Sequence, residues 1–187
     1  PGGHGHTFPG AVVPHGMIQP SPDTRIDGWD ACSGYYYADS TINGFSHTHV
    51  SGTGCCDYGD VLLMPTVGKQ QYRTTDPQSQ RLAYASSFSH KNEIAEPGYY
   101  SVFLDTYQVK AEISSTKRGA IHRYTFPENT ESGFIIDLDY SLQRQTNSEM
   151  EIEVISDTEI CGHKKTTYWA FDQYINFYAK FSKPFSY

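Results

Sequence analysis

The stretch GFSHTHVSGTGCCDYGD, residues 44–60, concentrates side chains that could do chemistry. His47 and His49 are two residues apart, so in an extended segment both project to the same face, as two ligands of one metal ion must. No third ligand follows at a diagnostic spacing, so the pair also fits histidines that only hydrogen-bond backbone and solvent. Asp57 and Asp60 in the same stretch could add oxygen ligands, and His4 and His6 repeat the two-residue spacing of the histidine pair.

The four cysteines do not indicate a disulfide, a zinc site or a thiol nucleophile. Cys55 and Cys56 are adjacent, so a disulfide between them would be strained, and no CxxC pair suggests zinc. A thiol nucleophile beside a histidine would need an oxyanion-forming turn and a residue that orients the base, and the sequence indicates neither. We therefore expect free, partly buried thiols at Cys32, Cys55, Cys56 and Cys161.

Carboxylates beside aromatic rings are the third pattern, as in DGWDACSGYYY, residues 27–37. The apolar face of a ring stacks on the C–H surface of a sugar, while fixed polar groups bind its hydroxyls. A glycosidase needs two carboxyl groups beside the scissile bond, about 6.5–9.5 Å apart when it inverts the anomeric configuration. Sequence spacing does not give that distance, and aspartates in such segments often cap turns. The candidates are Asp23, Asp27, Asp30, Asp39, Asp57 and Asp60.

The elements that hold these side chains are predicted to be strands joined by turns. The 187 residues suffice for one domain with a sizeable core, or at most for two small ones. Aromatics reach 14% beside 16 Gly and 10 Pro, a composition typical of strands joined by turns. The net charge is -7 and no basic run exceeds Lys164–Lys165, which argues against nucleic-acid binding. No stretch approaches the roughly 20 apolar residues that cross a bilayer.

Two regimes divide the chain. Residues 1–60 are irregular, and TFPGAVVPHGMIQPSPDTR, residues 7–25, holds four prolines, each of which lacks the backbone donor of a sheet ladder. A loop this long is usually functional. Residues 61–187 read as successive strands without a sustained helical period, which predicts a mainly antiparallel β-sandwich with little helix. The chain begins within a glycine-rich segment and stops just after a strand, so we expect a piece of a longer protein.

Alternating apolar residues mark the faces of these strands. Within residues 99–104 and 109–114, every second side chain is apolar and should face the core. Residues 151–156 and 174–181 repeat the alternation, with Ile152 and Val154 opposite glutamates in the former. The other predicted strands are residues 60–65, 119–126 and 133–140. The predicted core-facing residues of the first two are Tyr100, Val102, Leu104, Val109, Ala111 and Ile113.

Long motifs in four places carry a resemblance to a known family. They are GHTFPGAVVPHGMIQPSPDTR, GWDACSGYYYADSTINGFSHTHVSGTGCCDYGDVLLMP, EPGYYSVFL and RGAIHRYTFP. Together they resemble the N-terminal domain of glycoside hydrolase family 92, the exo-acting α-mannosidases of gut Bacteroides-like bacteria. The resemblance implies that residues 1–187 form one antiparallel β-supersandwich, with substrate-facing loops in residues 1–60 and mainly strands in residues 61–187. The C-terminal (α/α)6 barrel of the family is absent from this chain.

The same resemblance implies an activity and a location. Family members depend on calcium and invert anomeric configuration as they release mannose from N-glycan-type mannosides, and α-1,2 linkages are the expected substrate. The acid, the base and most calcium ligands belong to the barrel, so no catalytic or metal-binding residue is assigned in this chain. A periplasmic, cell-surface or secreted location follows from the resemblance.

What carries over is a sugar-facing wall of the −1 subsite. Phe8 and Trp29 fit its apolar surface. Polar groups that line or brace it are Arg25, Asp30, His47 and His49. The glycines Gly52, Gly54 and Gly59 are expected to permit tight turns rather than to contact the sugar.

Two other functions stay open. One is a non-catalytic carbohydrate-binding or interface module that uses the same aromatic loops without chemistry. The other is a β-sandwich enzyme built on a metal ion at His47 and His49. If the chain is instead the N-terminal domain of an α-mannosidase, as the resemblance implies, we expect it to bind mannose weakly on its own and to hydrolyse nothing measurable.

Overall fold

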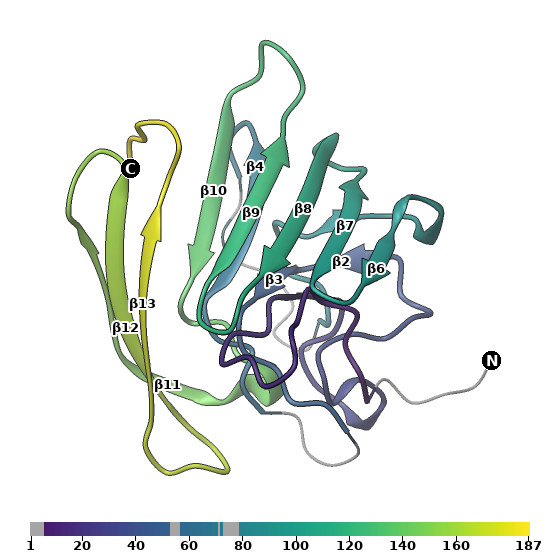
Figure 1. Ribbon diagram of the computed structural model, residues 1–187, viewed down its shortest axis with the longest axis vertical. Helices are drawn as coiled ribbons and strands as arrows, with labels where there is room; N and C mark the ends of the chain where they lie inside the picture. Colours follow the sequence, from purple (N-terminus) through teal and green to yellow (C-terminus); the bar gives the residue numbers. More distant parts are fainter. Residues whose placement is uncertain (1–5, 53–56, 71, 73–78) are drawn as a thin grey trace. The chain divides into compact units, whose positions relative to one another are not determined.

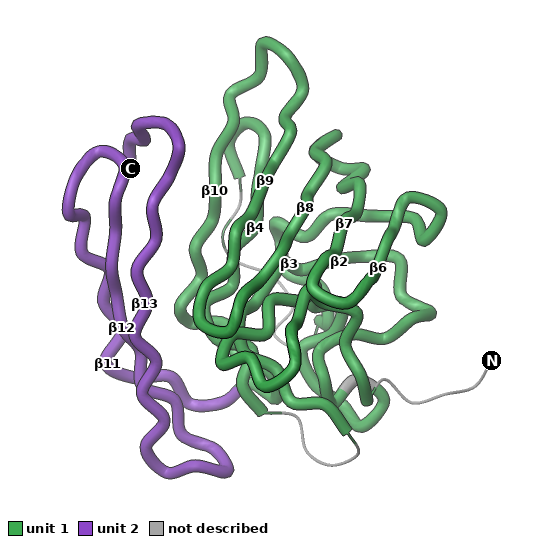
Figure 2. Tube along the Cα trace, in the orientation of Figure 1, with its two compact units in different colours: residues 1–144 green, residues 145–187 purple. Residues whose placement is uncertain are grey.

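A computed structural model describes residues 6–52, 57–70, 72 and 79–187 (Figure 1). The chain forms two compact units, residues 1–144 and 145–187 (Figure 2). Throughout the described residues, helix is confined to single 3-10 turns, so the predicted all-β fold is confirmed, and no described helix is long and apolar enough to cross a membrane. These turns are η1 (Trp29–Ala31), η2 (His90–Asn92) and η3 (Leu142–Arg144).

Unit 1 is built on two four-stranded antiparallel sheets. One has the strand order β1-β3-β4-β10 and the other β6-β7-β8-β9, while β2 and β5 form a short ladder of their own. The strands are β1 (Ser21–Asp23), β2 (Thr41–Ile42), β3 (Gly44–Ser46), β4 (Leu62–Val67), β5 (Ser86–Ser87), β6 (Ile94–Glu96), β7 (Tyr99–Leu104), β8 (Val109–Ser115), β9 (Ala120–Thr125) and β10 (Ser132–Asp137).

The core of unit 1 joins the inner faces of these two sheets. In β7 and β8 the period of two places alternate side chains inward, and all six predicted core residues are at most 1% exposed. Phe45, Leu62 and Met64 of the other sheet belong to the same buried cluster, each fully buried. Burying apolar surface contributes about 25 cal/mol per Å², so this cluster is the main stabilising contact between the sheets.

The outer face of β8 holds a carboxylate that is more buried than alternation predicts. Glu112 points away from the core, yet only 8% of its surface is exposed. Arg123 donates two hydrogen bonds of 2.8 and 2.7 Å to it, and the Tyr99 hydroxyl donates one of 2.9 Å. The bonds from Arg123 and then from Tyr99 lower the pKa of Glu112 to about 2. Long neighbouring side chains therefore cover this glutamate.

The first sixty residues are mainly irregular, as predicted, but they also contribute three short strands. Pro22 lies in β1, at the edge of its sheet, opposite Phe45 of β3. An edge strand tolerates proline because one of its sides needs no backbone donors. The proline-rich segment therefore enters the sheet only where its missing N–H groups are harmless.

Unit 2 is one antiparallel sheet of order β11-β12-β13, made of Thr146–Val154, Glu159–Thr167 and Gln173–Lys180. In β13, exposed polar and aromatic residues alternate with partly buried Ile175, Phe177 and Ala179, as the sequence predicts. In β11, by contrast, Ile152 and Val154 are 41% and 36% exposed, so the expected contrast with the glutamates is small. Since unit 2 consists of a single sheet, it has no second layer of its own to cover these residues.

Candidate functional site

Two ring contacts in unit 1 involve the predicted wall residues Phe8 and Trp29. The Phe8 ring packs on that of His49, with centroids 4.9 Å apart and planes at 36°. His6 meets the edge of Trp29 at 5.4 Å and 75°. The Gly52 N–H donates to the His6 carbonyl over 2.7 Å, which ties this segment to the loop after His49. Trp29 is 56% exposed, so much of its indole stays available to a ligand.

His49 is held by groups on both sides of its ring. Its Nε2 lies 2.7 Å from Asp23 Oδ1, and both side chains are fully buried. Its Nδ1 lies 2.7 Å from the Gln19 carbonyl, and Ser46 Oγ lies 3.1 Å from Nε2. Because its nitrogens are engaged, His49 offers Phe8 the face of its ring. His49 thus braces the predicted wall, and its direct contact with a sugar stays a prediction.

Asp23, one of the candidate carboxylates of the sequence analysis, is the side chain on which His49 is held. It ends β1 and is fully buried. Burial, followed by the negative charge of Asp23, raises the pKa of Tyr140 well above its ordinary value. Gly34 passes so close that a Cβ there would collide with Asp23 Oδ1. A buried carboxylate of this kind needs its partner, since an unpaired buried charge is strongly unfavourable.

His47 faces a different partner from His49. Its Nδ1 donates to the Val61 carbonyl over 2.6 Å, and its Nε2 lies 3.1 Å from Nε2 of His122 on β9. Burial lowers the pKa of both histidines. The two histidines that sequence spacing placed on one face therefore belong to separate hydrogen-bond networks.

This separation bears on the metal hypothesis. Among the described residues, no three His, Cys, Asp or Glu side chains gather in a group that could hold a metal ion. His4, Cys55, Cys56 and Gly54 lie outside the described residues. The two described cysteines, Cys32 and Cys161, are free thiols, as expected. Of the three glycines expected to permit tight turns, Gly52 and Gly59 are described and have φ of 114° and 79°, the left-handed region that favours glycine.

Arg25 is fixed by an ion pair. It donates three hydrogen bonds of 2.9 to 3.2 Å to the Asp39 carboxylate, and its guanidinium lies 4.1 Å from the centre of the Tyr36 ring. The bond to Asp39 is the main cause of a raised Arg25 pKa, and the negative charge of nearby Asp30 adds to it. The structure therefore brings Arg25 and Asp30 into one region, with Trp29 adjacent in the chain, and contact of these residues with a sugar stays a prediction.

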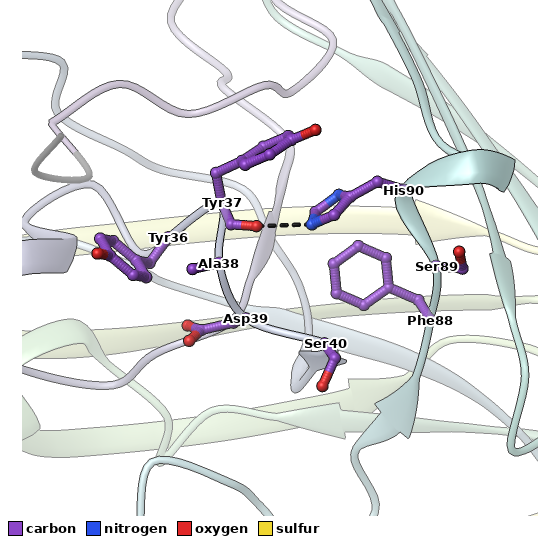
Figure 3. A pocket seen from close by; sticks show the side chains of 8 residues that line it. All are labelled: Tyr36, Tyr37, Ala38, Asp39, Ser40, Phe88, Ser89 and His90. Atoms are coloured by element: carbon purple, nitrogen blue, oxygen red, sulfur yellow. Dashed lines mark hydrogen bonds between the residues drawn. The ribbon is translucent and has the colours of Figure 1, made fainter. Parts of the chain in front are cut away.

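A hollow of about 430 Å³ lies beside this ion pair, lined by the eight residues labelled in Figure 3. Two of these lining residues are in contact: Tyr37 stacks on His90, with centroids 4.2 Å apart and planes at 11°. Sequence reasoning missed this site. The consecutive tyrosines of residues 35–37 were the available signal, whereas the segment around His90 carries no motif.

Comparisons with known proteins agree on one family. The model of the glycosyl hydrolase family 92 N-terminal domain matches residues 2–187. The structure of the family GH92 alpha-mannosidase BT3965 from Bacteroides thetaiotaomicron has a TM-score of 0.90 and 40% identity, over 97% of this chain and 24% of that one. The family GH92 inverting mannosidase BT2199 from the same species has a TM-score of 0.67 and 30% identity, over 86% of this chain and 20% of that one.

A curated relative extends the similarity to another organism. A protein of Arthroderma benhamiae, described as an uncharacterized secreted glycosidase, is 32% identical over 128 residues, which are 67% of this chain and 16% of the relative. The chain thus spans a quarter or less of the length of these relatives.

Proposed function

The chain belongs to the glycosyl hydrolase family 92 N-terminal domain family, and we propose that in a longer protein it supplies one wall of the −1 sugar subsite of an exo-α-mannosidase. The observation that carries this proposal is the pair Phe8 and Trp29, which ring contacts with His49 and His6 hold in place. An apolar ring in a fixed orientation offers a stacking surface to a pyranose without a large loss of side-chain entropy.

The carboxylates support a positioning role rather than an acid–base role for this chain. Asp23 is paired with His49, Asp27 with Arg144 and Asp39 with Arg25. Asp60 accepts a hydrogen bond from Thr48, so it too is engaged. We assign the general acid and base to the remainder of the longer protein. This chain would orient the mannose so that the acid and the water meet the glycosidic bond in line.

The finer properties of the enzyme belong to the same proposal. Inversion is supported by the similarity to BT2199, which is described as an inverting mannosidase. N-glycan-type mannosides with α-1,2 linkages, and export to the periplasm, the cell surface or the medium, are proposed from the family resemblance, and the description of the fungal relative as secreted supports export. In the part of the chain that the structure describes, no three His, Cys, Asp or Glu side chains gather in a group that could hold a metal ion, and we assign the calcium to the remainder of the longer protein without passing any step through it.

The proposal is tested by assaying aryl α-mannoside hydrolysis. The natural full-length protein and residues 1–187 alone are compared, each with and without a chelator. We expect turnover by the full-length protein, its loss on chelation, and none by residues 1–187. Turnover by the short chain would place the acid and base within it and overturn the proposal.

A non-catalytic carbohydrate-binding module is the second candidate. The engagement of the aspartates in ion pairs and hydrogen bonds favours it, because such a surface binds sugars without cleaving them. The same assay separates the two. A full-length protein that binds mannose but hydrolyses no α-mannoside would be such a module.

A further inference from the structure

The His90 ring, which lines the hollow of Figure 3, lies against the carboxylate of Glu93. Glu93 accepts hydrogen bonds from the Tyr100 hydroxyl at 2.7 Å and from the Tyr35 hydroxyl at 3.0 and 3.1 Å. Its Oε2 also lies 2.6 Å from Nδ1 of His90. Burial, followed by the charge of Glu93, raises the pKa of both tyrosines, so both keep the protons that they donate. The glutamate therefore fixes one side of the His90 ring.

The other ring nitrogen of His90 is fixed as well, by the backbone carbonyl of Tyr37. His90 Nε2 donates to the Tyr37 carbonyl over 2.6 Å, as the dashed line in Figure 3 marks. Phe88 meets the His90 ring edge-on, with centroids 5.0 Å apart. Tyr37 is 63% exposed and nonetheless stacks on this immobilised ring. Its orientation is thus set before any ligand binds, which reduces the entropy cost of binding.

Polar side chains line the hollow together with the aromatic rings. Asp39 lines it with its carboxylate held by Arg25, and Ser40 and Ser89 add hydroxyls. The volume of about 430 Å³ lies within the roughly 300–1,000 Å³ of small-molecule sites. A fixed aromatic surface combined with hydroxyls and an ion-paired carboxylate is the chemistry that recognises a neutral pyranose.

We propose that this hollow is a second sugar site, which binds one mannose ring of a mannoside. The C–H face of the ring lies on Tyr37, and its hydroxyls bind Asp39 and the flanking serines. The site goes beyond the wall formed by Phe8 and Trp29. The choice of mannose as the sugar rests on the proposed function.

The test measures D-mannose binding to the full-length protein by saturation-transfer NMR. Tyr37→Ala removes the stacking surface and should weaken mannose binding at the second site about tenfold. Tyr37→Phe keeps the ring, so its affinity for mannose at this site should stay within about twofold of the wild type. Tyr174→Ala is the matched control, because Tyr174 is 58% exposed but lies on β13. Its binding curve should match that of the wild type.

A second variant covers the case in which Tyr37→Ala fails to fold. Ala38→Trp retains Tyr37 and fills the hollow from its rim, so it should remove the same binding component. Mannose binding that is identical in the wild type, Tyr37→Ala and Ala38→Trp would overturn the second site. Aryl α-mannoside turnover by the wild type tests the proposed function separately. A protein without turnover but with Tyr37-dependent mannose binding would reject the proposed function and retain the site.

Discussion

His122 Nε2 and His47 Nε2 lie 3.1 Å apart, and this contact connects β9 to the loop that follows β3. Because Nδ1 of His47 donates to the Val61 carbonyl, Nε2 of the neutral ring is an acceptor, and His122 must donate to it. Nδ1 of His122 then accepts the hydroxyl of Tyr124 over 2.8 Å. The donors therefore run in one direction from Tyr124 to Val61, and protonation of either histidine would break this order.

Stability should consequently fall in mild acid. Both folded-state pKa values are lowered by burial, so the unfolded chain binds protons first as the pH drops below about 6.5. The stabilisation is complete above that pH and is lost as the pH falls toward the lowered values. We expect a smaller free energy of unfolding at pH 5 than at pH 7.5.

Thermal melts between pH 7.5 and 5 measure this loss. His122→Gln keeps a hydrogen-bonding side chain that does not titrate, so its melting temperature should depend less on pH than that of the wild type. His163→Gln, on partly exposed β12, is the control and should leave the pH dependence as it is. An equal slope in the wild type and His122→Gln would contradict the expectation.

Asp23→Asn should be among the most destabilising single substitutions. It removes the charge that pairs with fully buried His49, and breaking one side of a buried pair costs about 3–5 kcal/mol. Asp39→Asn breaks a comparable pair with Arg25, but these side chains are 19% and 30% exposed, so a cost of about 1 kcal/mol is expected. Melting temperatures of the two variants decide the point, and equal shifts would show that the burial of Asp23 is unimportant.

Gly34→Ala tests the space around the same carboxylate. Gly34 has φ of 83°, and a Cβ there would collide with Asp23 Oδ1. Gly68 has a similar φ of 71° with open space around it, so Gly68→Ala reports backbone strain alone. We expect about 1 kcal/mol from strain in both variants and an additional 1–3 kcal/mol at Gly34 from overpacking. Equal unfolding midpoints would refute the packing contribution.

The strands of the core were predictable because side chains alternate between the two faces of a strand, a pattern that depends only on neighbouring residues in the sequence. Tyr100 and Val102 occupy one face of β7 whatever the neighbouring strands are, so alternation alone identified them as core residues. Polar partners carry no such local signal. His122 lies 75 residues beyond His47, and nothing in the alternation of β9 indicates which inward residue will meet a histidine. Likewise, alternation made Glu112 an outward residue but gave no sign that Arg123 would cover it.

The candidate site was only partly within reach of the sequence. Phe8 and Trp29 came from the resemblance, and the structure adds what braces Phe8, namely His49 with Asp23 beneath it. The contacts that fix the His90 ring were missed because their members are far apart in the sequence; Tyr35, for example, lies 58 residues from Glu93. Such a cluster depends on tertiary packing, which the spacing of residues within a motif does not encode.

The proposed wall is tested most directly at Trp29. Its indole is 56% exposed and touches His6 at its edge, so Trp29→Ala removes a ligand surface with little loss of core packing. In the full-length protein we expect kcat/KM for an aryl α-mannoside to fall about 10- to 100-fold, since losing 1.4 kcal/mol of transition-state binding costs a factor of ten. Trp169→Ala is the matched control, because Trp169 is 66% exposed and lies in unit 2. Both variants should melt within a few degrees of the wild type. Unchanged kinetics in folded Trp29→Ala would remove Trp29 from the sugar site, whereas a selective loss at Trp29 would distinguish a substrate wall from a surface tryptophan without function.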